Sequence, residues 1–252
     1  MRDMEGKILE NVEIIEDHFI LTAEVKGRIG DVTPGQFLMV RIDGINVFLR
    51  RPFTIYDVDG RTFSIMYKVR GYGTRILSQV KKGQKMYFLG PLGNGFSLKE
   101  RDLYVVVAGG IGIAGVNLLV KRIGKRVKLF YGTSSSNGVS LLRDLLSYDP
   151  IISTMDGSSG YKGDVVSCLS DSFQNFTGMD IEIMACGPNE MYRSLRKALS
   201  KFSFPCQVLY EEKMACGMGL CFSCVVETKD NTDPLKRVCF DGPVFSLWDL
   251  CL

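Results

Sequence analysis

The spacing of hydrophobic positions changes twice along the chain. Residues 6 to about 98 contain short runs rich in β-branched and aromatic residues, each bounded by Gly, Pro or Asp. Strands this short and this closely spaced are typical of an antiparallel barrel. We expect strands over residues 6–15, 18–26, 35–42, 63–69 and 84–90.

A second pattern begins at Asp102, where continuous apolar runs alternate with segments of helical period. A continuous apolar run indicates a strand buried on both faces, and alternation with helices predicts a parallel α/β sheet. The alternation stops after Pro205. We therefore expect three parts: a barrel over 1–98, an α/β domain over 99–206 and a cysteine-rich subdomain over 207–252. Within the α/β part we expect strands over 102–110, 126–132 and 180–188, and helices over 113–123, 138–148 and 189–202.

Charge and composition exclude several classes of function. The net charge of +3 over 252 residues is too small to indicate a nucleic acid or an anionic membrane as partner. No apolar run approaches the roughly 18 residues that a membrane span requires. The opening MRDMEGKILENVEI does not have the pattern of a signal peptide, so we expect a cytoplasmic protein. His18 is the only histidine, which argues against histidine-assisted nucleophilic catalysis. We expect no catalytic side chain, and chemistry that depends on cofactors.

Three of the eight cysteines lie within MACGMGLCFSC, where Cys216, Cys221 and Cys224 form C-x4-C-x2-C and Cys239 is the next cysteine along the chain. That spacing is typical of plant-type [2Fe-2S] proteins. Gly217 and Gly219 let the backbone fold closely around a cluster and turn N–H groups toward its sulfur atoms. A zinc site and a buried thiol cluster are the alternatives.

Two loops of the α/β part follow strands. Gly110, Gly112 and Gly115 satisfy G-x-G-x-x-G between a strand and a helix, although the next strand ends in LFYGTSSS without the acidic residue of the full dinucleotide fingerprint. The alternative is that these glycines only allow tight packing of strand and helix. Cys186 and Gly187 follow another strand, and both loops are expected to line one crevice at the carboxyl ends of the strands.

Two stretches of the barrel part combine charged, aromatic and small residues. In RRPFT, alternation places Arg51 and Phe53 on one face of a strand and Pro52 and Thr54 on the other. In KVRGYGT, Gly73-Thr74 permits a phosphate to approach the backbone. Composition alone is equally compatible with an ordinary strand and turn.

The order of PGQFLMV, RPFT, GYGT, GPLGNGF, AGGIGIA and ACGP resembles that of ferredoxin–NAD(P) reductase-like flavoproteins. The tail, EEKMACGMGLCFSCVV with CFDGPVF, is similar to that of a narrower family, the electron-transfer subunits of type B dihydroorotate dehydrogenases. The resemblance covers residues 6–245. It departs from the superfamily where Phe53 replaces a tyrosine and where Gly115 replaces a common proline, and we expect Gly115 to occur by chance.

The resemblance implies FAD, a [2Fe-2S] cluster and NAD as a dissociable substrate. Arg51 would contact the flavin pyrophosphate, Phe53 the ring and Thr54 the region of N5. The remaining implied contacts fall into three sets: Pro52, Met66, Tyr67, Lys68, Gly73 and Thr74 for FAD; Gly110, Gly112, Cys186 and Gly187 for NAD; and Cys216, Cys221, Cys224 and Cys239 for the cluster. Asp156 is a candidate for the ribose of NAD, although a turn-forming Asp-Gly explains it equally well.

The implied function is electron transfer in pyrimidine (UMP) biosynthesis. Electrons would pass from an FMN-containing dihydroorotate dehydrogenase catalytic subunit, through the cluster and FAD, to NAD+. The implied complex is a heterotetramer with two copies of each subunit. The chain alone is not expected to oxidise dihydroorotate. The alternative is the flavin and iron–sulfur subunit of another NAD(P)H oxidoreductase, such as a sulfide dehydrogenase or a transhydrogenase.

Overall fold

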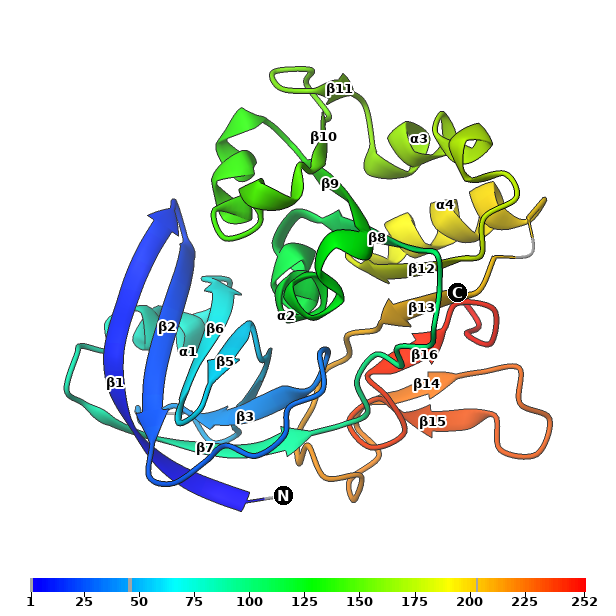
Figure 1. Ribbon diagram of the computed structural model, residues 1–252. Helices are drawn as coiled ribbons and strands as arrows, with labels where there is room; N and C mark the ends of the chain where they lie inside the picture. The colour runs from blue at the N-terminus through cyan, green and yellow to red at the C-terminus, as the bar shows by residue number, and fades with distance from the viewer. Residues whose placement is uncertain (1, 45–46, 203) are drawn as a thin grey trace. The chain divides into compact units, whose positions relative to one another are not determined.

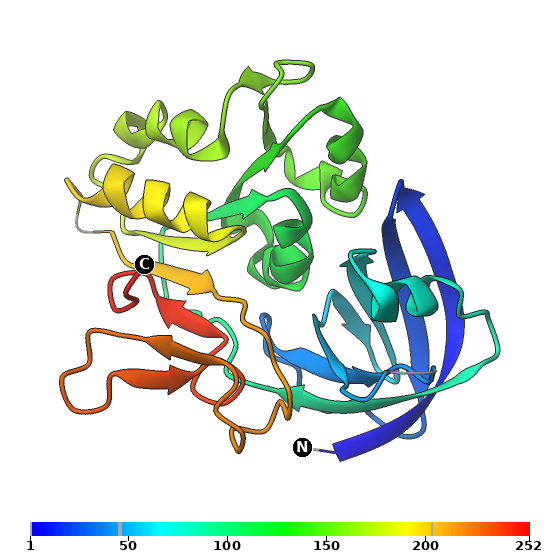
Figure 2. The same ribbon diagram turned by 180° about the vertical axis from the view of Figure 1, so that it is seen from behind.

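The computed structural model describes residues 2–44, 47–202 and 204–252. The chain forms two compact units (Figures 1 and 2). The first contains Met1–Gly95 and Tyr210–Pro243, and the second contains Phe96–Leu209 and Val244–Leu252. The boundary expected at residue 206 lies at the start of strand β13 (Cys206–Leu209). The division into a barrel, an α/β domain and a separate cysteine-rich subdomain stays a prediction.

The first unit is built on a seven-stranded antiparallel sheet in the order β4-β3-β7-β1-β2-β6-β5. Its edges approach each other, because the ring of Phe53 on β4 lies 5.7 Å from the ring of Tyr67 on β6. Inside, Phe63 on β6 meets Phe88 on β7 edge-to-face at 4.9 Å. The predicted antiparallel barrel is confirmed. The strands are β1 (Arg2–Ile15), β2 (His18–Val25), β3 (Phe37–Arg41), β4 (Arg51–Thr54), β5 (Asp57–Asp59), β6 (Thr62–Lys68) and β7 (Lys85–Leu92).

Alternation of side chains explains why these segments form a curled sheet. Along β7, Met86, Phe88 and Leu92 are buried while the residues between them are partly exposed or at the surface, apart from the buried Gly90. One face of the strand therefore covers the barrel core. Helix α1 (Tyr72–Ser78) connects β6 to β7. The late segment of this unit carries a small antiparallel hairpin of β14 (Val225–Glu227) and β15 (Leu235–Arg237).

The second unit contains a seven-stranded sheet in the order β11-β10-β9-β8-β12-β13-β16. All neighbouring strands are parallel except β13 and β16, which are antiparallel. The central strands are continuous apolar runs, as the sequence predicted, and β12 is buried throughout. The strands are β8 (Leu103–Gly109), β9 (Val127–Thr133), β10 (Ile151–Thr154), β11 (Tyr161–Lys162), β12 (Ile181–Cys186), β13 and β16 (Val244–Ser246).

Helices cover both faces of this sheet. Helix α2 (Ile113–Ile123) lies on one face, and α3 (Val165–Ser170) and α4 (Asn189–Leu199) lie on the other (Figures 1 and 2). The predicted helix over 113–123 is confirmed. Strand β10 and helix α3 were not predicted, since the sequence offers only short runs there.

The predicted α-helix over 138–148 is wrong. The segment forms 3₁₀ turns over Ser136–Leu142 and Leu146–Tyr148. The buried hydroxyl of Tyr131 donates to the carbonyl oxygen of Gly138 at 3.0 Å, and an α-helix would direct that oxygen at the N–H four residues on. A contact distant from the local pattern therefore holds the turn.

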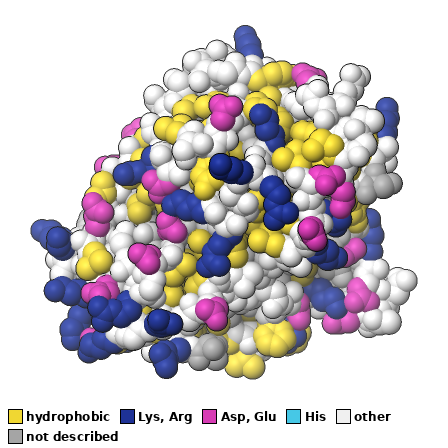
Figure 3. Space-filling model, viewed as in Figure 1, with side chains coloured by type: hydrophobic (Ala, Val, Ile, Leu, Met, Phe, Trp, Pro, Cys, Tyr) yellow, Lys and Arg dark blue, Asp and Glu magenta, His cyan; other side chains and the backbone are white. Residues whose placement is uncertain are grey.

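Both signs of charge are interspersed over the face drawn in Figure 3, in keeping with the small net charge. No helix among the described residues has the length and apolar character needed to cross a membrane.

Candidate iron–sulfur and flavin-nucleotide site

The hairpin of β14 and β15 brings together cysteines that are distant in the sequence. Cys224 immediately precedes β14, and Cys239 follows β15 by two positions. Because Val225 pairs with Arg237 and the N–H of Val238 donates to the carbonyl of Cys224 at 2.9 Å, Cys224 and Cys239 become neighbours.

The four cysteines form two pairs of thiols. The thiol of Cys221 hydrogen-bonds that of Cys216, and the thiol of Cys224 hydrogen-bonds that of Cys239. None of these cysteines is in a disulfide. Across the part of the chain that the structure describes, no three His, Cys, Asp or Glu side chains converge as ligands of one metal ion. Each iron of a [2Fe-2S] cluster takes two thiolates, so two pairs fit that donor set.

Backbone N–H groups point at the sulfur atoms. Met218 donates to Cys216 Sγ at 3.3 Å, Gly219 to Cys239 Sγ at 3.1 Å and Cys239 to Cys224 Sγ at 3.4 Å. Such bonds stabilise an anionic cluster and tune its potential. Gly217 and Gly219 have φ of +70° and +78°, which L side chains rarely adopt, so the loop requires glycine at both positions.

The two pairs contain thiols of opposite character. Burial tends to raise the pKa of Cys216, but hydrogen bonds from the N–H groups of Met218 and Cys221 and from the Cys221 thiol outweigh it and lower the pKa to about 6. Burial and the neighbouring Cys224 raise the pKa of Cys239 to about 12. The N–H groups around Cys216 therefore favour the thiolate, the form that binds iron, whereas burial of Cys239 favours its thiol.

The structure brings the arginine of RRPFT to the glycine turn of KVRGYGT. A Cβ placed on Gly73 would lie 3.5 Å from Nε of Arg51, so the guanidinium lies against this turn. The neighbouring Arg50 is committed elsewhere, since it binds both carboxylate oxygens of Asp3 at 2.9 and 2.8 Å. Nη1 of Arg51 donates to Leu49 O at 2.6 Å, which leaves Nε and Nη2, the nitrogens nearest Gly73, for an anion at this turn.

Strand β4 presents its residues as alternation predicted. Phe53 pairs in register with Leu38, and Pro52 pairs with Met39. Cross-strand partners share a face, so Pro52 and Thr54 lie on the face of Met39, while Arg51 and Phe53 lie on the opposite one. Met39 contacts the cluster loop, because a Cβ on Gly217 would lie 2.5 Å from its Cγ.

Two of the expected FAD contacts use their side chains within the protein. The hydroxyl of Tyr67 donates to Asn11 Oδ1 at 3.0 Å, and the side chain is buried. The hydroxyl of Thr74 accepts from the N–H groups of Arg70 and Gly71 at 2.9 and 3.1 Å. Both hydroxyls therefore already have partners within the protein. Strand β5 pairs with β6 only as far as Ser64, so along Met66–Lys68 the second edge of β6 is hydrogen-bonded to no strand among the described residues, although the ring of Phe53 on β4 lies near it. Backbone groups are what this edge offers a nucleotide.

The two loops of the second unit lie together at the point where the strand order reverses, between β8 and β12. A Cβ on Gly112 would lie 2.2 Å from the carbonyl oxygen of Cys186, and one on Gly109 would lie 3.1 Å from Pro188 Cδ. Ligands of open α/β sheets bind outside such a switch point. The hydroxyl of Tyr192 fixes the second loop by accepting from Gly187 N at 3.0 Å and donating to Leu209 O at 2.5 Å.

Gly115 fits the packing alternative given for the glycine motif, and not the expectation that it occurs by chance. A Cβ on it would lie 2.6 Å from Cys186 Sγ, so the glycine lets α2 cross β12 closely. The Cys186 thiol is buried.

Asp156 accepts from the hydroxyl and the N–H of Ser158 at 2.6 and 2.9 Å, contacts that lower the pKa of the carboxyl group. That arrangement is an Asx turn.

Comparison with known proteins assigns the family. Residues 211–251 match the family model described as the iron–sulfur cluster binding domain of dihydroorotate dehydrogenase B. The chain is 36% identical over 244 residues to the dihydroorotate dehydrogenase B (NAD(+)) electron transfer subunit of Caldanaerobacter subterraneus subsp. tengcongensis, covering 96% of each chain. It is 35% identical to the corresponding subunit of Listeria monocytogenes, covering 97% of each. The chain belongs to this family, the dihydroorotate dehydrogenase B electron transfer subunits.

Solved structures agree with the fold of this family member. An NADH-dependent reduced ferredoxin-NADP oxidoreductase, studied for flavin-based electron bifurcation, superposes with a TM-score of 0.84 at 26% identity, covering 97% of this chain and 89% of that one. A ferredoxin NADP+ reductase from Neisseria gonorrhoeae with bound FAD and NADP gives 0.68 at 16% identity, covering 81% and 92%. The latter likeness concerns the fold alone.

Proposed function

We propose that this electron transfer subunit carries electrons from an FMN-containing, dihydroorotate-oxidising catalytic subunit to NAD+ in UMP biosynthesis, with a [2Fe-2S] cluster and FAD as resident cofactors. The observation that carries the proposal is the pairing of four thiols under three N–H···S hydrogen bonds. This arrangement lies within the segment that matches the cluster-binding domain.

The cofactors supply the electron chemistry when bound, with one-electron transfer at the cluster and exchange between one-electron and hydride transfer at the flavin. The protein supplies their positions. Cys216, Cys221, Cys224 and Cys239 would hold the cluster. Arg51 would pair with the flavin pyrophosphate beside Gly73, and the open edge of β6 would hydrogen-bond the nucleotide.

The second unit would bind NAD(H) at the switch point formed by Gly110, Gly112, Cys186 and Gly187. The loop after β9, TSSSNG, contains no arginine to pair with a 2'-phosphate, which favours NAD over NADP. Asp156 lies beside this loop, since its N–H donates to Ser134 O at 3.3 Å.

Three large apolar side chains are exposed at the cluster loop: Leu220 is 75% exposed, Phe222 58% and Phe240 56%. Leu220 and Phe222 flank the exposed Cys221, and Phe240 lies 2.9 Å from a Cβ placed on Gly219. Large exposed apolar side chains that gather in this way mark interaction sites. We assign this patch, Leu220, Phe222 and Phe240, to the FMN subunit, since electrons must enter near the cluster. The assembly proposed is a heterotetramer with two copies of each subunit.

Reconstitution tests the proposal. The holo chain alone should oxidise NADH with an artificial acceptor, faster than it oxidises NADPH, and should not oxidise dihydroorotate. Adding the FMN subunit should give dihydroorotate-dependent NAD+ reduction. Cys221→Ser should abolish the coupled reaction and retain NADH oxidation, because a hydroxyl is a poorer iron ligand than a thiolate.

The matched control is Cys251→Ser, which changes an exposed cysteine outside the two pairs and should leave both activities intact. Dihydroorotate oxidation by the chain alone, or coupled activity without the cluster, would contradict the proposal. The runner-up is a flavin and iron–sulfur subunit of another NAD(P)H oxidoreductase. The likeness to the bifurcating enzyme at 26% identity supports it, but the relatives at 36% and 35% identity fit the first reading better. The runner-up predicts no coupling to a dihydroorotate-oxidising partner.

A further inference from the structure

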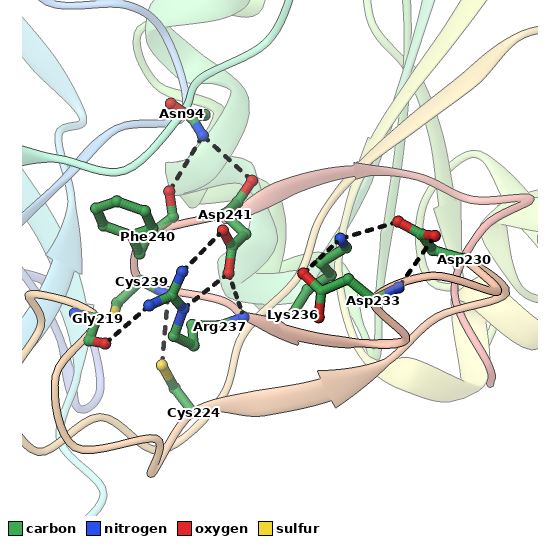
Figure 4. A network of polar contacts seen from close by, with 10 residues as sticks. All are labelled: Asn94, Gly219, Cys224, Asp230, Asp233, Lys236, Arg237, Cys239, Phe240 and Asp241. Atoms are coloured by element: carbon green, nitrogen blue, oxygen red, sulfur yellow. Dashed lines mark hydrogen bonds and ion pairs between the residues drawn. The ribbon is translucent and has the colours of Figure 1, made fainter.

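Gly219 is held from both sides within the cluster loop. Its N–H donates to Cys239 Sγ at 3.1 Å, and its carbonyl oxygen accepts from Nη1 of Arg237 at 3.1 Å (Figure 4). Arg237 is the last residue of β15 and lies two residues before Cys239. One short segment therefore supplies both the sulfur that receives the N–H and the cation that anchors the carbonyl.

The guanidinium of Arg237 is itself fixed. It binds both carboxylate oxygens of Asp241, through Nε at 3.0 Å and Nη2 at 3.3 Å. It lies over the ring of Phe240 at 4.5 Å and over that of Phe222 at 5.3 Å. A forked ion pair combined with aromatic stacking leaves the side chain little freedom.

The turn that carries this ion pair is anchored to the barrel. Nδ2 of Asn94 donates to the carbonyl oxygens of Phe240 and Asp241, each at 3.2 Å (Figure 4). The Asn94 N–H donates to Gly242 O at 2.6 Å. Asn94 belongs to GPLGNGF and follows β7. A continuous set of contacts thus runs from the barrel, through Arg237, to the loop that carries Cys216 and Cys221.

We propose that Arg237 is a positioning residue that sets the reduction potential of the cluster by holding the Gly219 N–H on Cys239 Sγ. Gly219 has φ of +78° and no side chain, so its peptide plane rotates easily unless the carbonyl is anchored. An N–H directed at a ligand sulfur stabilises the more negative, reduced cluster, and its loss lowers the potential. The inference rests on the cluster assignment of the proposed function, and not on the identity of the electron donor.

A purely electrostatic role for Arg237 makes a different prediction. A cation near the cluster raises the potential wherever its charge lies, so Arg237→Lys would leave the potential unchanged. Asp241→Asn would raise it, because a negative charge is removed. The positioning role predicts that both substitutions lower the potential. Lys provides no fork for Asp241 and Gly219, and Asn holds the guanidinium less firmly.

The test is an EPR-monitored redox titration of the holo chain. We expect Arg237→Lys and Asp241→Asn each to shift the midpoint potential to more negative values and to alter the reduced-state spectrum. Lys236→Gln is the matched control. Lys236 pairs with Asp230 and Asp233, each at 3.0 Å, so its substitution removes a charge but no contact of Arg237 with Gly219. Its shift should therefore be smaller than that of the charge-conserving Arg237→Lys, whereas a purely electrostatic effect would give the reverse order.

Arg237→Lys could also lose the cluster while it retains FAD. If Lys236→Gln keeps its iron, that loss would support the positioning role, because the Gly219 peptide would then have moved far enough to release the cluster. A wild-type potential in Arg237→Lys, or a raised potential in Asp241→Asn, would overturn the positioning role. A wild-type chain with no [2Fe-2S] signal would instead refute the cluster assignment itself, so the two failures are distinguishable.

Discussion

The cluster loop and the nucleotide-side loops of the second unit use glycine for different purposes. Gly217 and Gly219 have positive φ, and an added Cβ would also lie 2.5 Å from Met39 Cγ and 2.9 Å from Phe240 Cβ, so backbone conformation as well as space requires glycine there. At Gly112, Gly115 and Gly187 the constraint is space, since an added Cβ would lie 2.2 Å from Cys186 O, 2.6 Å from Cys186 Sγ and 2.5 Å from Met191 Cε, respectively. A glycine motif therefore does not by itself distinguish a turned peptide from a close crossing of elements.

The two regions also differ in what supports them. The loops of the second unit rest on buried tyrosine hydroxyls, Tyr131 under Gly138 and Tyr192 under Gly187. The cluster loop rests on bonds to cysteine sulfur and on Arg237, whose side chain is 27% exposed. We infer that the nucleotide loops keep their shape without a ligand, whereas the cluster loop depends on its iron.

Removal of iron should produce the largest difference between the cluster loop and the nucleotide loops. In the chelator-treated protein, amide hydrogen exchange should accelerate strongly over residues 214–224. Cysteine thiolates released from iron repel one another or take up protons, and they then no longer hold the N–H···S bonds. Residues 109–115 and 186–188 should exchange as in the holo protein. Equal acceleration in both regions, or none in the cluster loop, would remove the distinction between them.

Adding a methyl group to the glycine loop should have the next largest effect. Gly112→Ala places a Cβ against a backbone oxygen that cannot move aside, and we expect a loss of roughly 2–3 kcal/mol in the free energy of unfolding of the second unit. The control is Gly110→Ala. That position has open space but φ of +53°, so only about 1 kcal/mol should be lost. Thermal unfolding measures both, and equal losses would mean that close packing is not the constraint at Gly112.

Sequence was sufficient where structure depends on local patterns, since hydrophobic period predicted the barrel, the parallel sheet and the helix over 113–123. The four cysteines predicted as cluster ligands lie in two pairs, and their role as ligands stays a prediction. Sequence failed where a contact comes from far along the chain. Two contacts have no local signature: the Tyr131 bond that replaces a helix at Gly138, and the link from Asn94 to the turn of Arg237. The packing alternative for Gly115 was visible in the sequence, but its partner Cys186 was not. The FAD and NAD contacts stay predictions, although Arg51 and Gly73 lie together.

The smallest expected effect tests the buried tyrosine under the nucleotide loop. At pH 7, Tyr131→Phe should cost about 1–2 kcal/mol, because the buried carbonyl of Gly138 loses its hydrogen bond. Burial raises the pKa of Tyr131 to about 12 from the ordinary value of 10, with a hydrogen bond to Thr133 opposing the rise. Above pH 10 the unfolded tyrosine ionises while the folded one keeps its proton. The stability of the wild type should therefore fall between pH 10 and 12, by up to roughly 1.4 kcal/mol per pH unit. The phenyl ring of the variant cannot ionise, so the difference in free energy of unfolding between the two proteins should shrink across this window and can change sign.

Urea unfolding at pH 7, 9 and 11 measures this difference. The control for losing one phenol is Tyr148→Phe, since Tyr148 is a half-buried tyrosine in the same unit. A difference that stays constant with pH would show that Tyr131 is accessible to water, and the nucleotide loop would then rest on a support as open as that of the cluster loop.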